Sequence, residues 1–209
     1  MQDAVEQAYE KGYLGNNILG TNFSLDVVVH LGAGAYICGE ETALLNSLEG
    51  KRGEPRLKPP YFPAVMGLYN KPTLVNNVET ISSVPWIIQN SGKEYSKLGV
   101  EGSTGTRIFS LSGHVNNPGN FEIEMGQSFG EFIDTFGKGI KNNKNVKAYI
   151  PGGASAPWFT GDQLDIKMTI DDVANAGSML GSGAVVVMDE DTNLVLSLIH
   201  ISEPTRRRG

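Results

Sequence analysis

The spacing of apolar residues predicts regular elements along the first quarter of the chain. Residues 2–12 have helical spacing and end at Gly12, and the segment at residues 25–30, with its apolar run at 27–29, predicts a buried strand. Gly32, Ala33 and Gly34 then predict a sharp turn, and helical spacing resumes and ends at Gly50. A strand, a glycine turn and a helix form the kind of edge at which α/β sheets place nucleotides.

The glycines of this turn do not form a dinucleotide-binding fingerprint. G-x-G-x-x-G would need a glycine at Ile37, whereas the third glycine is Gly39. Glu40 and Glu41 fall in the first helical turn, where unpaired N–H groups and the helix dipole stabilise carboxylates. From spacing alone, an ordinary tight turn with helix-start acids explains the pattern as well as a nucleotide site does.

The next segment, residues 51–70, predicts an irregular surface loop because its prolines exclude a helix or a strand. It carries Lys58, Tyr61 and Phe62, a cation and two rings that can pair with a phosphate and stack on a purine. The alternative is that the rings only attach the loop to the core. Asn76 with Glu79 then predicts a capping box that opens a helix towards residue 90.

The second half of the chain predicts a small α+β domain. Residues 95–106 are rich in small residues and predict a linker, and Ser128 with Glu131 predicts a second capping box at the start of a helix. Strands are predicted at residues 107–112, 121–124, 146–150 and 184–188, and a short helix at 171–176. This order of elements is typical of a β-grasp fold.

Composition narrows the class of protein. The 209 residues carry a net charge of −6, and the one basic block, at residues 206–208, does not indicate nucleic-acid binding. Cys38 is the single cysteine, so the chain has no internal disulfide and no four-cysteine metal site. The sequence has no apolar run of about 20 residues, so we expect no membrane span and a soluble, intracellular protein. We expect structural roles for His30 and His114, and no catalytic acid or base.

Two long motifs carry a resemblance to a known family. GAGAYICGEETALLNSLEGKRGEPRLKPP, followed by KPTLVNNVETISSVP, resembles the NADH-binding flavoprotein subunit of respiratory complex I, which is the F subunit of NADH-quinone oxidoreductase. The resemblance extends from about Ala4 to about Val195. It implies an incomplete Rossmann-like FMN/NADH-binding α/β domain at 1–103, a soluble-ligand-binding β-grasp (SLBB) domain at 104–193 and a tail at 194–209 that looks non-native.

The resemblance implies hydride transfer from NADH to FMN, followed by electron transfer to iron–sulfur clusters and quinone. Its FMN contacts would be Tyr36, Gly39, Glu40, Val75, Asn76, Asn77 and Thr80. Its NADH contacts would be Glu41, Lys58 and one of Tyr61 and Phe62, because this chain reads KPPYFP where the family reads KPPFP. No residue is implied as catalytic or as a metal ligand.

The resemblance also implies partners and a location. The partners would be other peripheral-arm subunits of complex I, especially the 2Fe–2S subunit, and the location would be cytoplasmic, at the inner face of the cell membrane. The family's flavin-binding glycine loop and the cysteine ligands of its 4Fe–4S cluster are missing from this sequence, so we expect an inactive fragment. The alternative is a homologous diaphorase subunit of an NAD-linked hydrogenase or formate dehydrogenase.

Overall fold

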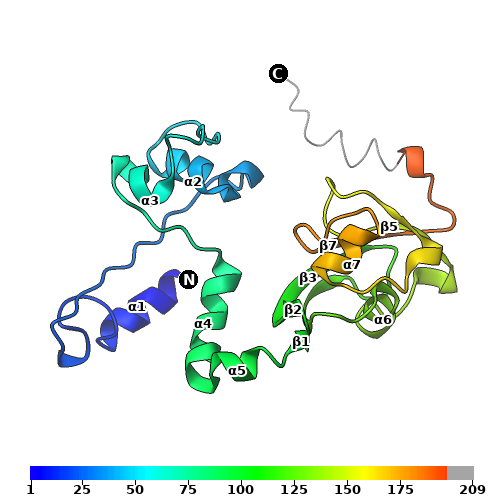
Figure 1. Ribbon diagram of the computed structural model, residues 1–209, viewed down its shortest axis with the longest axis horizontal. Helices are drawn as coiled ribbons and strands as arrows, with labels where there is room; N and C mark the ends of the chain where they lie inside the picture. Colours follow the sequence, from blue (N-terminus) through cyan, green and yellow to red (C-terminus); the bar gives the residue numbers. More distant parts are fainter. Residues whose placement is uncertain (197–209) are drawn as a thin grey trace. The chain divides into compact units, whose positions relative to one another are not determined.

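A computed structural model describes residues 1–196 of the chain (Figure 1). The chain divides into two compact units, the first comprising Met1–Asn77 and the second beginning at Val78. These units are the parts of the chain that make most of their contacts within themselves, and they need not coincide with family domains. The expected domain boundary at 103/104 therefore stays a prediction. The predicted tail at 194–209 lies outside the described residues from residue 197 onward.

The first unit consists of short helices joined by extended chain. Its elements are α1 (Gln2–Glu10), η1 (Ile18–Gly20), η2 (Tyr36–Gly39), α2 (Glu41–Leu48), α3 (Pro63–Met66) and η3 (Leu68–Asn70). Helix α1 ends as predicted at Gly12, whose N–H donates to the carbonyl of Tyr9 while that of Tyr13 donates to Ala8. This pair of bonds needs a left-handed residue, and Gly12 has φ 71°.

The predicted strand at residues 25–30 is wrong. Leu25 makes an isolated bridge with Gly15, which is the only strand pairing within residues 1–77. The chain that follows is extended but exposed, with Val28 87% accessible. A strand forms only when a neighbouring strand pairs with its backbone and covers its apolar side chains, so an apolar run cannot become one alone.

The second unit contains a five-stranded mixed sheet in the order β4-β3-β7-β5-β6. These strands are β3 (Thr106–Gly113), β4 (Gly119–Glu124), β5 (Val146–Ile150), β6 (Phe159–Thr160) and β7 (Ala184–Asp189). The strands β3 and β7 run parallel, and the remaining neighbours are antiparallel. The predicted strands are confirmed, and β6 is an addition that the sequence pattern did not predict. With the helices, the sheet gives the chain the predicted mixed α/β class.

Helix α6 (Phe129–Thr135) supplies the centre of the hydrophobic core in this unit. It opens with the predicted capping box, in which Ser128 Oγ accepts from the N–H of Glu131 and the Glu131 carboxylate accepts from that of Ser128. Phe129 and Phe132 are fully buried, and the Phe132 ring lies 5.8 Å from that of Phe109 on β3. The other helical elements are η4 (Lys141–Asn143), η5 (Gly161–Gln163) and α7 (Ile170–Asn175).

The predicted linker at residues 95–106 is instead an ordered hairpin. After α4 (Val78–Asn90) and α5 (Gly92–Tyr95), β1 (Gly99–Val100) pairs with β2 (Ser103–Thr104). Ser103 is buried, and its hydroxyl accepts from the N–H of Ile170 at 3.4 Å. A run of small residues predicts flexibility from composition, whereas here the glycines permit close packing.

Helix α4 begins at Val78, so Asn77 rather than Asn76 immediately precedes it. Glu79, predicted to reach back to the helix start, places its Oε1 2.9 Å from the N–H of Ile108 on β3. No helix within residues 1–196 has the length and apolar character to cross a membrane.

Candidate functional site

Glu40 caps the N-terminus of α2. Its Oε2 accepts hydrogen bonds from the N–H groups of Thr42 and Ala43 at 2.9 and 2.8 Å and from the Thr42 hydroxyl at 2.6 Å. Desolvation pushes the pKa of Glu40 upward, but these hydrogen bonds and the charge of Lys58 outweigh it, so the pKa lies below its usual value. The residue therefore presents an ionised carboxylate at the helix start.

Lys58 bridges the two adjacent acids. Its Nζ lies 3.5 Å from Glu40 Oε1 and forms a hydrogen-bonded ion pair with Glu41 Oε1. The bond to Glu41, together with both negative charges, raises the pKa of Lys58 despite partial desolvation. The structure thus brings together three residues that the sequence analysis assigned to two cofactors. Two carboxylates compete with a phosphate for the charge of this ammonium group, which still has a third N–H donor to offer.

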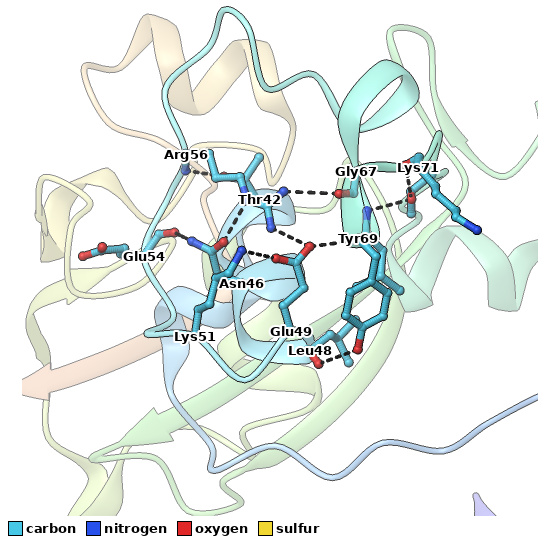
Figure 2. A network of polar contacts seen from close by, with 12 residues as sticks. Thr42, Asn46, Leu48, Glu49, Lys51, Glu54, Arg56, Gly67, Tyr69 and Lys71 are labelled. Carbon is cyan, nitrogen blue, oxygen red and sulfur yellow. Dashed lines mark hydrogen bonds and ion pairs between the residues drawn. The ribbon is translucent and has the colours of Figure 1, made fainter.

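The loop that carries Lys58 is fastened to α2 by Arg56 (Figure 2). The Arg56 guanidinium donates to Asn46 Oδ1 at 2.8 Å and to the carbonyl of Gly67 at 3.3 Å, and it lies 3.0 Å from Glu49 Oε1. The side chains of Arg56 and Glu49 are only 9% and 5% exposed. Because both are largely shielded from water, this ion pair is screened less than a surface pair.

The Glu49 carboxylate accepts hydrogen bonds from three different residues. Hydrogen bonds from Lys51, then Arg56, then the N–H of Tyr69 lower the pKa of Glu49 to about 2. Figure 2 shows this carboxylate between the end of α2 and the segment after α3. The irregular loop predicted over residues 51–70 is confirmed only as far as residue 62, because α3 and η3 occupy its last part. Pro63 stands in the first turn of α3, where a proline is tolerated, so it does not exclude this helix. Through Lys51, Arg56 and Tyr69, Glu49 joins the loop and η3 to the end of α2.

The aromatic residues of the loop differ in their surroundings. The Tyr61 ring lies 6.0 Å from the Arg56 guanidinium carbon and is 37% exposed, whereas Phe62, which precedes α3, is 50% exposed. Neither side chain is part of the buried core of residues 1–77. Which of the two stacks on NADH stays a prediction.

The residues predicted to contact FMN come from three segments. Tyr36 and Gly39 belong to η2, directly before the Glu40 cap, and the Tyr36 side chain is 90% exposed. A Cβ added to Gly39 would meet no protein atom within 4 Å, so the protein itself does not demand glycine there. This open approach beside an exposed aromatic ring fits a flat ring system such as the isoalloxazine of FMN.

The remaining predicted FMN residues follow η3. Val75, Asn76 and Asn77 lie in extended chain at the end of the first unit. Thr80 lies in α4 of the second unit, where it lines an open pocket with Ser83, Tyr95 and Arg107. The roles of all these residues in binding stay predictions.

The sequence analysis did not identify Thr42, Asn46, Glu49 or Arg56. One signal was present, because Glu49 is an acid at the negative end of a helix, where it is unfavourable unless a cation compensates it. The partner, Arg56, stands only seven positions later but gives no periodic signal in a loop. Within residues 1–196, no cluster of three or more His, Cys, Asp or Glu side chains is arranged to hold a metal.

Comparison with known proteins identifies relatives of the chain. Residues 1–86 match the family model described as the Nuo51 FMN-binding domain. The F subunit of NADH-quinone oxidoreductase in Mycobacterium bovis is 51% identical over 195 residues, covering 93% of this chain and 43% of the relative. The F subunit of the same enzyme in Rickettsia rickettsii is 46% identical over 204 residues, covering 97% of this chain and 48% of the relative.

A solved structure has a similar fold. The crystal structure of an NAD⁺-reducing [NiFe]-hydrogenase in the H2-reduced state superposes with a TM-score of 0.73 at 34% identity. The match covers 85% of this chain and 29% of the hydrogenase chain. The chain thus spans less than half the length of the curated relatives quoted above, which it covers to 43% and 48%.

Proposed function

Because the chain belongs to the family of the NADH-quinone oxidoreductase F subunit, we propose that it contributes to a site where hydride passes from NADH to FMN. The observation that carries the proposal is the group formed by Glu40, Glu41 and Lys58 at the start of α2. When bound, FMN supplies the hydride acceptor and a means of passing electrons on one at a time. The protein positions the two cofactors and selects NADH over NADPH.

Glu41 is the residue that selects the dinucleotide in this proposal. Its carboxylate accepts hydrogen bonds from the ribose hydroxyls of NADH and repels the 2′-phosphate of NADPH. Lys58 pairs with a phosphate of the dinucleotide, and its move away from Glu41 frees that carboxylate for the ribose. The two residues exchange their mutual contact for contacts with one ligand, Lys58 with a phosphate and Glu41 with ribose hydroxyls.

Glu40, Gly39 and Tyr36 form the proposed edge of the flavin site. The Glu40 carboxylate is held by three donors on one oxygen, and its other oxygen, Oε1, has the ion pair with Lys58 at 3.5 Å. Gly39 allows the flavin to approach the backbone closely, and the exposed Tyr36 ring can cover it. Val75, Asn76, Asn77 and Thr80 complete the proposed set of flavin contacts.

The proposed setting is a membrane-associated complex that reduces quinone. Its other peripheral subunits, including one with a 2Fe–2S cluster, would receive the electrons at the cytoplasmic side of the membrane. A 4Fe–4S cluster belongs to the proposed whole subunit, but Cys38 is the single cysteine and residues 1–196 hold no group of three or more potential ligands. Whether the present chain is active by itself is part of what the test below decides.

A second candidate function is the diaphorase part of an NAD-linked hydrogenase. The likeness to the hydrogenase structure favours it, because the same site would serve the same hydride transfer in either assembly. The two candidates differ only in the electron acceptor. Identification of the subunits that copurify with the tagged chain from its native cells, by mass spectrometry, separates quinone-reducing from hydrogen-oxidising assemblies.

The primary test is a titration of the 209-residue chain with FMN, followed by flavin fluorescence, and then with NADH. We expect saturable quenching of the flavin fluorescence. Bleaching of the flavin absorbance when NADH is added would show that the chain is active by itself, against the expectation of an inactive fragment. Lys58→Ala should weaken NADH binding about tenfold, as expected for the loss of one charged contact. Lys93→Ala, which removes an exposed lysine on α5, should change neither titration. A chain folded by circular dichroism that binds no FMN would overturn the proposal for this chain.

A further inference from the structure

Thr42 connects the Glu40 carboxylate to the loop that carries Lys58. Its hydroxyl donates to Glu40 Oε2 at 2.6 Å and accepts from the Arg56 N–H at 2.8 Å. The residue is only 1% exposed, so water does not compete for these bonds. A hydroxyl has a single proton, and giving it to Glu40 leaves the lone pairs for Arg56.

This bond pattern makes the two oxygens of Glu40 unequal. Oε2 accepts from Thr42 twice and from Ala43 once, which satisfies it fully, while Oε1 faces Lys58 at 3.5 Å. Hydrogen bonds to Oε2 restrict rotation of the carboxylate group, so Oε1 points in one direction. Thr42 therefore decides where the free oxygen points.

The same hydroxyl also fixes the position of the loop relative to α2. Arg56 is two residues before Lys58, and its backbone is tied to Thr42 while its side chain is tied to Asn46 and Glu49, all on or at the end of α2. Figure 2 shows Thr42 and Asn46 lying against Arg56. With the backbone of Arg56 held against the helix, the Lys58 ammonium reaches both acids.

We propose that Thr42 is a positioning residue that sets Glu40 and Lys58 in one arrangement before a dinucleotide binds. It touches no ligand itself and acts through the carboxylate and the loop. The proposal rests on the proposed function for its purpose. Its physical content, the orientation of Glu40 by one hydroxyl, can be measured without any ligand.

The first experiment compares the carboxyl titration of Glu40 by ¹³C NMR in the whole 209-residue chain. Thr42→Val keeps the shape of the side chain but removes the hydroxyl, so the pKa of Glu40 should rise. Thr42→Ser keeps the hydroxyl, so the pKa should stay lowered. Thr73→Val is the matched control. Like that of Thr42, the Thr73 hydroxyl accepts one hydrogen bond from a backbone N–H, that of Leu68, but it donates to the carbonyl of Lys71 and not to Glu40. It should lower stability without moving the Glu40 pKa.

The second experiment measures NADH binding by calorimetry in the same variants and in Lys58→Ala. Thr42→Val should weaken binding about tenfold, Thr42→Ser should restore it and Thr73→Val should leave it unchanged. An unchanged Glu40 pKa in Thr42→Val overturns the proposal. So does unchanged NADH affinity in Thr42→Val when Lys58→Ala weakens binding. If Lys58→Ala has no effect either, the proposed function fails, and the Glu40 pKa alone decides whether Thr42 orients the carboxylate.

Discussion

At the scale of single residues, the candidate site is built from three carboxylates and the donors and cations that contact them. Glu40 is held by backbone N–H groups and a hydroxyl, Glu41 by Lys58, and Glu49 by Arg56 and Lys51. The sequence predicts the first two acids as candidates because they stand at a helix start. For Glu49 the sequence offers only its unfavourable place at the end of a helix, and its partners could not be predicted, since they lie on a loop and on the segment after α3.

Glu49 should make stability depend on acid pH. Its pKa falls from 4.5 to about 2 on folding, so its contribution is fully present above about pH 4.5 and is lost as the pH falls towards 2. Urea unfolding of the chain and of Glu49→Gln should therefore show a difference in the free energy of unfolding that is constant near neutral pH and shrinks below about pH 4.5. A difference that does not vary with pH would contradict the ion pair.

Glu41 should govern the choice between NADH and NADPH. In Glu41→Gln the repulsion of the 2′-phosphate is removed, so the preference for NADH should fall about tenfold. Binding constants for both dinucleotides, measured by calorimetry, test this. Glu54→Gln, an exposed acid in the same loop region, is the control and should keep the preference. Equal preference in Glu41→Gln and the unaltered chain would exclude Glu41 as the selecting residue.

Gly39 should matter for the flavin but not for the fold. An added Cβ meets no protein atom within 4 Å, so Gly39→Ala should change the free energy of unfolding by less than about 0.5 kcal/mol. It should weaken FMN binding about tenfold, because the methyl group occupies space next to the proposed ligand. Gly92→Ala is equally unobstructed, lies in α5 and should affect neither quantity. Undiminished FMN affinity in Gly39→Ala would remove it from the site.

At the scale of elements, sequence prediction succeeds where the deciding contacts are local. The ends of α1 and α2 at Gly12 and Gly50 and the capping box of α6 all depend on residues close together along the chain. It fails at residues 25–30 and 95–106, where an apolar run and a glycine-rich run were assigned by composition. Pairing with another part of the chain decides both cases, and composition does not contain that information.

The β1–β2 hairpin gives a test at this scale. Gly105 has φ 92°, and an added Cβ would lie 2.5 Å from the hydroxyl of Tyr95, so Gly105→Ala should destabilise the chain by about 2–3 kcal/mol. Gly102 has φ 79° but its Cβ would come no closer than 3.7 Å to Asp171, so Gly102→Ala should cost only about 1 kcal/mol. Thermal or urea unfolding measures both. Equal, small costs would mean that this segment is a linker, as its composition indicates.

At the scale of the whole molecule, the two units differ in how much apolar surface they bury. The second unit has a continuous core that includes Phe109, Phe132, Tyr149 and Val187, whereas the buried residues of the first unit are few and lie around α2, Thr42, Ala43 and Leu45 among them. Buried apolar area is the main source of stability. The second unit should therefore hold the more stable part of the chain.

Hydrogen exchange combined with one core variant tests this difference. Backbone amides of β3, β5 and β7 should exchange at least about 100-fold more slowly than those of residues 26–35, which lack regular pairing. Phe132→Ala should cost the second unit about 3–5 kcal/mol and leave exchange in α2 unchanged. Ile108→Ala, at a half-exposed site on β3, is the control and should cost less than about 1 kcal/mol. Loss of protection in α2 together with β3 would show that the units unfold as one.

The sequence by itself determined the glycine ends of α1 and α2, the capping box of α6, the order of strands along the second unit, and the acidic pair and the lysine of the candidate site. Those features depend on periodicity, caps and turn residues, whose physical causes act over a few positions. Only the tertiary structure decided that Lys58 bridges both acids, that Arg56 and Thr42 hold it there, and that β3 lies parallel to β7. These contacts join residues that are distant in sequence. Their formation depends on how the chain packs, which no local pattern specifies.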